Sequence, residues 1–168
     1  MYGSYTSYIE YYGSDGLQEN AFAGLGKKAD RLMDSYTTTV DGVRKLKEYY
    51  PTDEASAEAV QMCHAEIVNI LWQINEAEKA AQSARGYVET ENGLRGKAIS
   101  SVSAGNESIS YSASGSESAS TAIDKAVVDK AEQHKLILDV IRTYLSGISD
   151  RNGVNLMYGG RYPCLKTQ

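Results

Sequence analysis

One apolar stripe in the middle of the chain constrains the fold more than any other feature of the sequence. Between residues 53 and 85, apolar side chains recur at alternating steps of three and four: Val60, Cys63, Ile67, Ile70, Ile74, Ala77 and Ala81. This spacing places them on one face of an α-helix. Thr52 is a candidate N-cap, acidic residues follow it, and Gly86 is a stop signal. We therefore predict a long helix from about Asp53 to Arg85.

Helical periodicity also appears on both sides of this segment. In residues 17–36 the side chains at helical spacing are Phe22, Leu25, Ala29, Leu32 or Met33, and Tyr36. A short helical piece is expected between them and Pro51. A final helix within 117–149 begins near Ser120 and Thr121, with the stripe Val127, Ala131, His134, Leu138, Ile141, Leu145 and Ile148. The fold class is therefore mainly α: a small helical bundle in a single domain, residues 1–168, that is helical over 17–93 and again over 117–149.

Residues 94–116, between the two long helices, are rich in Ser, Gly and Ala. A two-residue turn at Gly105-Asn106 would place Val102, Ile109 and Tyr111 on one face of a β-hairpin. An isolated hairpin is marginal in water, so this one needs a surface on its own helices or on a neighbouring subunit. We predict an inserted β-hairpin here, and a flexible linker is the alternative.

Both ends of the chain also carry side chains suited to contacts. The chain has 13 Tyr against one Phe and one Trp, and five of these tyrosines lie in the first dozen residues. Tyrosine is enriched at surfaces that meet a partner, so Tyr5, Tyr8 and Tyr11 in segment 1–16 are contact candidates. The alternative is a weakly ordered N-terminus. Residues 150–168 are too apolar for a solvated tail and too short for a domain, which predicts an extended C-terminal arm.

Composition excludes several classes of protein. The net charge is −5 and the basic residues are scattered, so we expect no sequence-specific nucleic-acid binding. Two cysteines far apart, with no signal peptide before them, favour a reducing cytoplasm. No apolar run approaches the length of a membrane span, so no membrane partner is expected.

The sequence gives little sign of catalytic chemistry. His134 lies on an apolar stripe, which favours a core or interface position. His64 follows Cys63, but adjacent helix positions point about 100° apart and do not form a nucleophile–base pair. Cys63, His64 and Cys164 lack the spacing of metal ligands. GLGKKAD at 24–30 lacks the full spacing of a phosphate loop. We predict no catalytic residues, no metal and no cofactor.

Three segments carry a resemblance to a known family. They are NAFAGLGKKADRLMDSYTT at 20–38, LRGKAISSVSAGNESISYS at 94–112 and NLMYGGRYP at 155–163. In this order, together with two long helices, they resemble the head–tail connector proteins (adaptor or head-completion proteins) of long-tailed double-stranded DNA bacteriophages. The Tyr-Gly-Gly-Arg of the tail departs from the family's Tyr-Arg-Gly-type pattern, and the tyrosine-rich N-terminus has no counterpart there.

The resemblance implies a structural protein of the virion, assembled in the cytoplasm of a bacterial host and located at the head–tail junction. Such proteins form an oligomeric ring of identical copies, typically twelvefold, beneath the portal protein. The ring extends the channel through which DNA passes, and it offers a platform to a further neck protein, such as a stopper or tail-completion protein. The family has no catalytic activity and no cofactor.

The resemblance also implies roles for particular residues. In such rings the C-terminal segment commonly reaches the portal, so the portal-binding candidates are Leu156, Met157, Tyr158, Arg161 and Tyr162. The hairpin residues Val102, Ile109 and Tyr111 would contact a neighbouring subunit or another neck component. The alternative interpretation is a cytoplasmic helical regulator that binds one protein partner through the hairpin and the tail.

Overall fold

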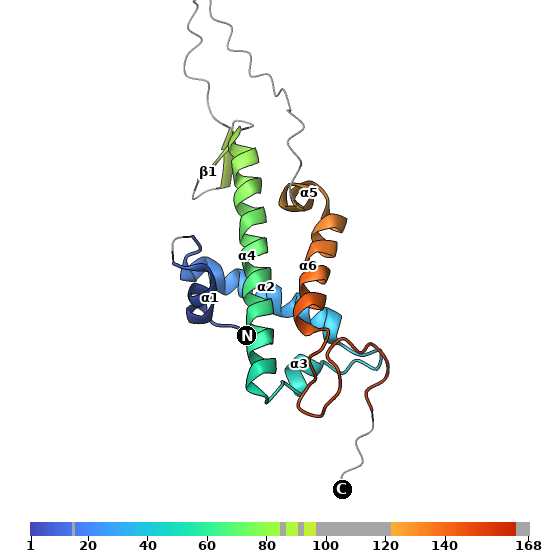
Figure 1. Ribbon diagram of the computed structural model, residues 1–168. Helices are drawn as coiled ribbons and strands as arrows, with labels where there is room; N and C mark the ends of the chain where they lie inside the picture. Colours follow the sequence, from blue (N-terminus) through green and yellow to red (C-terminus); the bar gives the residue numbers. More distant parts are fainter. Residues whose placement is uncertain (15, 85–86, 91–92, 97–121, 164–168) are drawn as a thin grey trace, which may run out of the picture.

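The computed structural model describes residues 1–14, 16–84, 87–90, 93–96 and 122–163. Its elements, in chain order, are α1 (Tyr5–Tyr12), α2 (Glu19–Thr37), α3 (Lys45–Glu48), α4 (Glu54–Ala84), β1 (Tyr87–Thr90), β2 (Gly93–Gly96), α5 (Ala122–Val128) and α6 (Lys130–Leu145). The fold is mainly α, as predicted. Helix α4 forms the axis of the body, and α1, α2, α5 and α6 pack against it (Figure 1).

The predicted stripe on α4 is the centre of the core. Val60, Cys63, Ile67, Ile70 and Ile74 are all buried, and Val68, Leu71 and Ala65 widen the buried face. The N-cap differs from the prediction. The carboxylate of Asp53, rather than the Thr52 hydroxyl, accepts the backbone N–H of Ser56 at 2.9 Å. A cap of this kind satisfies one of the free N–H groups of the first turn.

Helix α2 forms where the sequence predicted a helix, and it packs across α4. Its buried face shows which of Leu32 and Met33 belongs to the core. Met33 is fully buried, whereas Leu32 only packs against the edge of the core. Gly26 is buried within the helix because Met1 and His64 approach it closely, so a β-carbon there would collide with the Met1 side chain. The glycine that weakens the helix thus allows a close contact.

The final helix is broken, which corrects the prediction of one helix over 117–149. Asp129 has an extended backbone, and its carboxylate accepts the N–H of Ala131 at 2.8 Å, which starts α6 as a separate helix. Ala131 and His134, which the predicted stripe included, are exposed in the first turns of α6. The buried face of α6 is formed by Ile137, Val140, Ile141 and Leu145.

A short hairpin follows α4 where the sequence interpretation extended the helical region to residue 93. Strands β1 and β2 are antiparallel, and Thr90 pairs with Gly93. The β-favouring residues Tyr87 and Val88 are the local signal for the first strand. The hairpin predicted around Gly105-Asn106, with Val102, Ile109 and Tyr111, lies outside the described residues.

The two ends of the body carry different parts of the chain. Residues 96 and 122, which flank segment 97–121, lie at the end formed by the β-hairpin and α5 (Figure 1). Residues 149–163 lie at the opposite end, beside α3. They fold back on the body, so the predicted extended arm is wrong for residues 150–163. Among the described helices, none is both long and apolar enough to cross a membrane.

Candidate functional site

Two features of the described residues bear on chemical reactivity. No group of three or more His, Cys, Asp or Glu side chains among them could hold a metal ion. Cys63 is fully buried, and burial together with the nearby Glu66 raises the pKa of its thiol to about 12. A thiol of this kind stays protonated and is a poor nucleophile. The sequence-predicted contact residues that the structure describes lie where the two ends of the chain meet the body.

A buried lysine organises the C-terminal end. Lys45 of α3 is fully buried, and its ammonium group donates to the backbone oxygen of Asn155 at 3.0 Å and to that of Tyr158. The Tyr158 ring centroid lies 5.9 Å from the same nitrogen. Burial lowers the pKa of Lys45, while Asp150 opposes that shift. Lys45 thus holds residues 155–158 against α3.

Asp150 closes a tight turn within the same segment. Its buried carboxylate accepts the backbone N–H groups of Asn152 and Val154, each at 2.9 Å, and the hydroxyl of Tyr162 at 2.6 Å. Gly153 supplies the positive φ that the turn needs. Burial and the hydrogen bond to Asp150 raise the pKa of Tyr162 to about 12. The carboxylate therefore serves as the structural centre of this turn.

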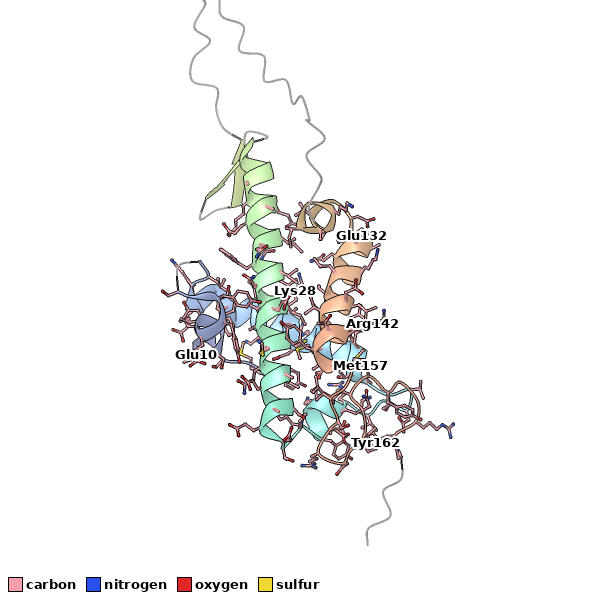
Figure 2. All side chains as sticks on the ribbon, in the orientation of Figure 1. Glu10, Lys28, Glu132, Arg142, Met157 and Tyr162 are labelled. Atoms are coloured by element: carbon pink, nitrogen blue, oxygen red, sulfur yellow. The ribbon has the colours of Figure 1, made fainter. Side chains whose placement is uncertain are left out.

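Further contacts join the segment to residues on both sides of α3. The Tyr162 ring stacks on Tyr49 with centroids 4.9 Å apart, and its backbone N–H donates to the Asp41 carboxylate at 3.2 Å. The N–H of Val40 donates to the backbone oxygen of Gly159 at 3.2 Å. Figure 2 shows Met157 and Tyr162 within this folded end rather than on a free arm.

The five portal-binding candidates fall into three groups by burial. Leu156 is fully buried in the core, which corrects its assignment as a docking residue. Met157 and Tyr162 are partly buried, because they pack on the body. Tyr158, 47% exposed, and Arg161 remain accessible.

Val40 adds an apolar side chain to this accessible surface. Its side chain is 76% exposed, and its backbone N–H is hydrogen-bonded to the backbone oxygen of Gly159, next to Tyr158. We call Val40, Tyr158 and Arg161 the C-terminal face. An exposed apolar side chain and an exposed tyrosine beside an arginine are the residue types that protein interfaces favour.

The N-terminal contact candidates, Tyr5, Tyr8 and Tyr11, also differ in burial. Tyr8 is 2% exposed, its hydroxyl donates to Asn69 of α4 at 3.2 Å, and its ring lies 5.7 Å from that of Phe22. Tyr8 is therefore a core residue and not a contact residue. Tyr5 is partly buried and donates to the backbone oxygen of Leu17 at 2.9 Å, whereas Tyr11 is exposed.

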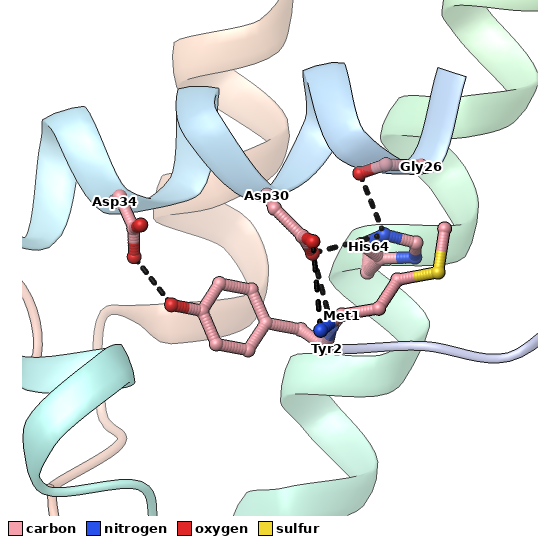
Figure 3. Close-up of polar contacts among 6 residues, drawn as sticks. All are labelled: Met1, Tyr2, Gly26, Asp30, Asp34 and His64. Carbon is pink, nitrogen blue, oxygen red and sulfur yellow. Dashed lines mark hydrogen bonds and ion pairs between the residues drawn. The ribbon is translucent and has the colours of Figure 1, made fainter. Parts of the chain in front are cut away.

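Residues 1–4, which we call the strap, lie across α2 and α4 (Figure 3). The carboxylate of Asp30 accepts the backbone N–H of Tyr2 at 2.9 Å, and it lies 3.6 Å from the Met1 ammonium group and 3.3 Å from His64 Nε2. His64 is fully buried, and its Nε2 also lies 3.2 Å from the backbone oxygen of Gly26. Burial by itself raises the pKa of Asp30, but the hydrogen bonds from His64 and Tyr2 outweigh it and lower that pKa overall.

The Tyr2 side chain fixes the strap at a second point. Its hydroxyl donates to Asp34, one turn along α2 from Asp30, and its ring stacks on Tyr50 with centroids 6.1 Å apart. Burial and the hydrogen bond to Asp34 raise the pKa of Tyr2. Sequence reasoning missed Lys45, Asp30, Asp34 and Asp150, because ordinary charged residues in a helix or loop give no local signal of burial or of a distant partner.

Three tyrosine hydroxyls donate to carboxylates, namely those of Tyr2, Tyr144 and Tyr162. Tyr144 donates to Glu66 at 2.6 Å, and this bond together with burial raises the pKa of Tyr144. A raised pKa means that the folded protein holds the phenolic proton more tightly than the unfolded chain. For Tyr162 the resulting stability is fully present below the ordinary pKa of 10.0 and is lost as pH rises through about 12.

We therefore expect the melting temperature to fall steeply between pH 10.0 and about 12. Thermal unfolding of the protein and of a Tyr144→Phe/Tyr162→Phe variant, measured across this window, tests it. The variant should lose less of its melting temperature over the window, because two of the titrating groups are gone. Tyr36→Phe, whose hydroxyl faces His134 and not a carboxylate, is the control. Equal slopes for all three proteins would contradict the prediction.

Comparisons with protein-family models, with curated proteins and with solved structures gave no match to this chain. The family resemblance therefore rests on the three sequence segments themselves. Their described residues fold into α2, most of β2 and the C-terminal end.

Proposed function

We propose that this protein is a structural virion protein of the phage neck, a head–tail connector that forms a ring under the portal and extends the DNA channel. The order of the three resembling segments along the chain supports this proposal. Its partners would be the portal protein, neighbouring copies of itself and a further neck protein. DNA would pass through the ring without sequence-specific binding.

The observation that carries the proposal is that the C-terminal face and the residues flanking segment 97–121 lie at opposite ends of a helical body. Gly96 and Ala122, which flank that segment, are at the end formed by β1, β2 and α5, and the C-terminal face lies at the other end, beside α3 (Figure 1). A part that joins two neighbours stacked along one axis needs contacts at both of its ends. The arrangement is consistent with the C-terminal face meeting the portal.

The chemistry of the described residues also supports a structural role. The part of the chain that the structure describes offers no metal-binding group, and its cysteine is a buried thiol with a raised pKa. The net charge of −5 suits the wall of a channel through which DNA must slide, because a basic surface would retain the phosphates.

Electron microscopy of the purified protein mixed with the portal of the same virus tests the proposal. A ring added to the narrow end of the portal is the expected result. A small closed oligomer with no affinity for the portal would overturn the connector role and favour the helical regulator.

We expect the double variant Tyr158→Ala/Arg161→Glu to lose portal attachment while keeping its fold, because both side chains are exposed. Arg142→Glu, on the exposed side of α6 (Figure 2), should attach normally. Deleting residues 154–168 would be a poor test, because it also removes the core residue Leu156. Portal pull-down and melting temperature are the measurements. Normal attachment by the double variant would place the docking surface elsewhere.

For the other end of the body, Val102→Asp/Ile109→Asp should block ring assembly, because charges replace the apolar side chains on one face of the sequence-predicted hairpin. Ser103→Asp/Ser110→Asp introduces the same charges on the opposite face of that hairpin and should assemble. Ring counts by electron microscopy and helix content by circular dichroism compare the two variants. Equal assembly by both would contradict the role given to this segment.

A further inference from the structure

Residues 1–12 form a unit that is attached to the body through a short glycine-containing linker. This N-terminal unit consists of the strap and α1. Gly13 adopts φ +79°, which side chains rarely tolerate, and a β-carbon there would meet nothing within 4 Å. Gly16, in contrast, is pressed against α4, where a β-carbon would lie 2.8 Å from Trp72 Cη2. Gly16 therefore anchors the linker and Gly13 is the natural pivot.

The groove that holds the strap recognises it through specific polar contacts. Asp30 and Asp34 of α2 accept the N–H and the hydroxyl of Tyr2, and Gly26 leaves room for the Met1 side chain. Open hollows of about 520 Å³ and 630 Å³ adjoin the strap, and Met1 and Tyr2 line both of them. The strap is thus seated like a bound peptide beside open space.

Removing the N-terminal unit from the groove would cost free energy, because it would expose buried groups. Without α1, the Tyr8 site would expose Phe22 and leave the Asn69 side chain without its partner. Without the strap, the buried His64 side chain would be exposed to solvent. Its Nδ1 has no hydrogen-bond partner among the described residues and faces Gly3, where a β-carbon would lie only 2.6 Å away. The unit can therefore be exchanged for an identical one more easily than it can be released.

We propose that the N-terminal unit is exchanged between neighbouring copies in the assembled ring, so that residues 1–12 of one copy occupy the α2–α4 groove of the next. This inference rests on the proposed ring. Exchange keeps every contact of the unit and changes only the linker, which makes it a low-cost route to association. A ring also holds neighbouring copies at a high effective concentration.

The linker restricts the geometry of the exchange. Residues 13–16 span at most about 14 Å when extended, so the two grooves must belong to copies in direct contact. Exchange in one direction around an axis links each copy to the next and closes a ring, whereas reciprocal exchange between two copies stops at a dimer.

Cross-linking between two different chains tests the exchange. Ser7 Oγ of α1 lies 3.5 Å from Gln61 Oε1 of α4. One chain carries Ser7→Cys, and a second chain, lengthened by a tag, carries Gln61→Cys, both with Cys164→Ser. Buried Cys63, with its raised pKa, stays unreactive. The full-length chains are assembled together on the portal and treated with a short bismaleimide.

The expected result is a covalent heterodimer in the assembled fraction and none in the monomer fraction. A single chain with both cysteines should cross-link within itself as a monomer and lose that cross-link on assembly. Thr143→Cys, exposed on α6, replaces Gln61→Cys in the matched control and should give no heterodimer.

The outcomes separate the exchange from the proposed function. Rings that form without the heterodimer overturn the exchange and leave the neck role standing. A heterodimer within a small closed oligomer that ignores the portal supports the exchange and overturns the neck role. Neither assembly nor heterodimer at any concentration overturns both.

Discussion

Lys45→Ala is expected to lower the free energy of unfolding by about 3 to 5 kcal/mol. The lysine is fully buried, so the substitution opens a cavity between α3 and the C-terminal segment. It also leaves the backbone oxygens of Asn155 and Tyr158 without their donor. Urea denaturation measures the loss, and hydrogen exchange should show residues 149–163 opening before the rest of the core.

Two matched variants separate the causes. Lys47→Ala lies in the same short helix but is exposed, so it should change stability by no more than about 0.5 kcal/mol. Lys45→Met keeps most of the volume and removes the ammonium group, which isolates the cost of the unpaired carbonyls, roughly 1 to 3 kcal/mol. If Lys45→Ala and Lys47→Ala were equally mild, the C-terminal end would not depend on the buried lysine.

Elements with a long apolar period could be predicted from the sequence. The stripe on α4 repeats over many turns, and a period sustained for that length has only one regular structure that buries it. The same holds for α2, where the burial of Phe22, Ala29 and Met33 follows the predicted face. In both cases the information is local, because it lies in the spacing of neighbouring side chains.

The break at Asp129 and the fold of the C-terminal end could not be predicted in the same way. Asp129 competes with the continuing helix by offering its carboxylate to Ala131, and a periodicity argument takes no account of such a competitor. The C-terminal residues turn inward because Lys45 binds Asn155, 110 positions away in sequence. An apolar segment such as this one predicts that a surface will cover it, but the sequence does not say that the surface is the protein's own α3.

The tyrosines show a related limit. Their number predicts large side chains with a polar end, and both a core and an interface use such side chains for the same physical reason. In the structure Tyr2, Tyr8 and Tyr144 place their rings against the body while their hydroxyls reach Asp34, Asn69 and Glu66. Among the described tyrosines, Tyr11 and Tyr12 of α1 and Tyr158 of the C-terminal face remain substantially exposed. The number of tyrosines in the sequence does not show which of them are buried and which are exposed.

Tyr8→Ala should cost about 3 to 5 kcal/mol in the free energy of unfolding, because it empties a buried aromatic site between α1, α2 and α4. Tyr8→Phe keeps the ring and removes only the hydrogen bond to Asn69, so it should cost about 1 kcal/mol. Tyr11→Ala, in the same helix but exposed, should stay within about 0.5 kcal/mol of the unmodified protein. Denaturant unfolding of the three variants measures this order.

The same three variants bear on assembly. The Tyr8 site is filled by the N-terminal unit whether that unit comes from its own chain or from a neighbour, so Tyr8→Ala should weaken the fold and the ring together. Tyr11 does not take part in the buried site, and Tyr11→Ala should therefore leave the fold intact and change assembly only if the exposed side of α1 meets another copy. A Tyr8→Ala protein as stable as Tyr11→Ala would mean that α1 is not part of the core, and the N-terminal tyrosines would again be candidates for contacts with a partner.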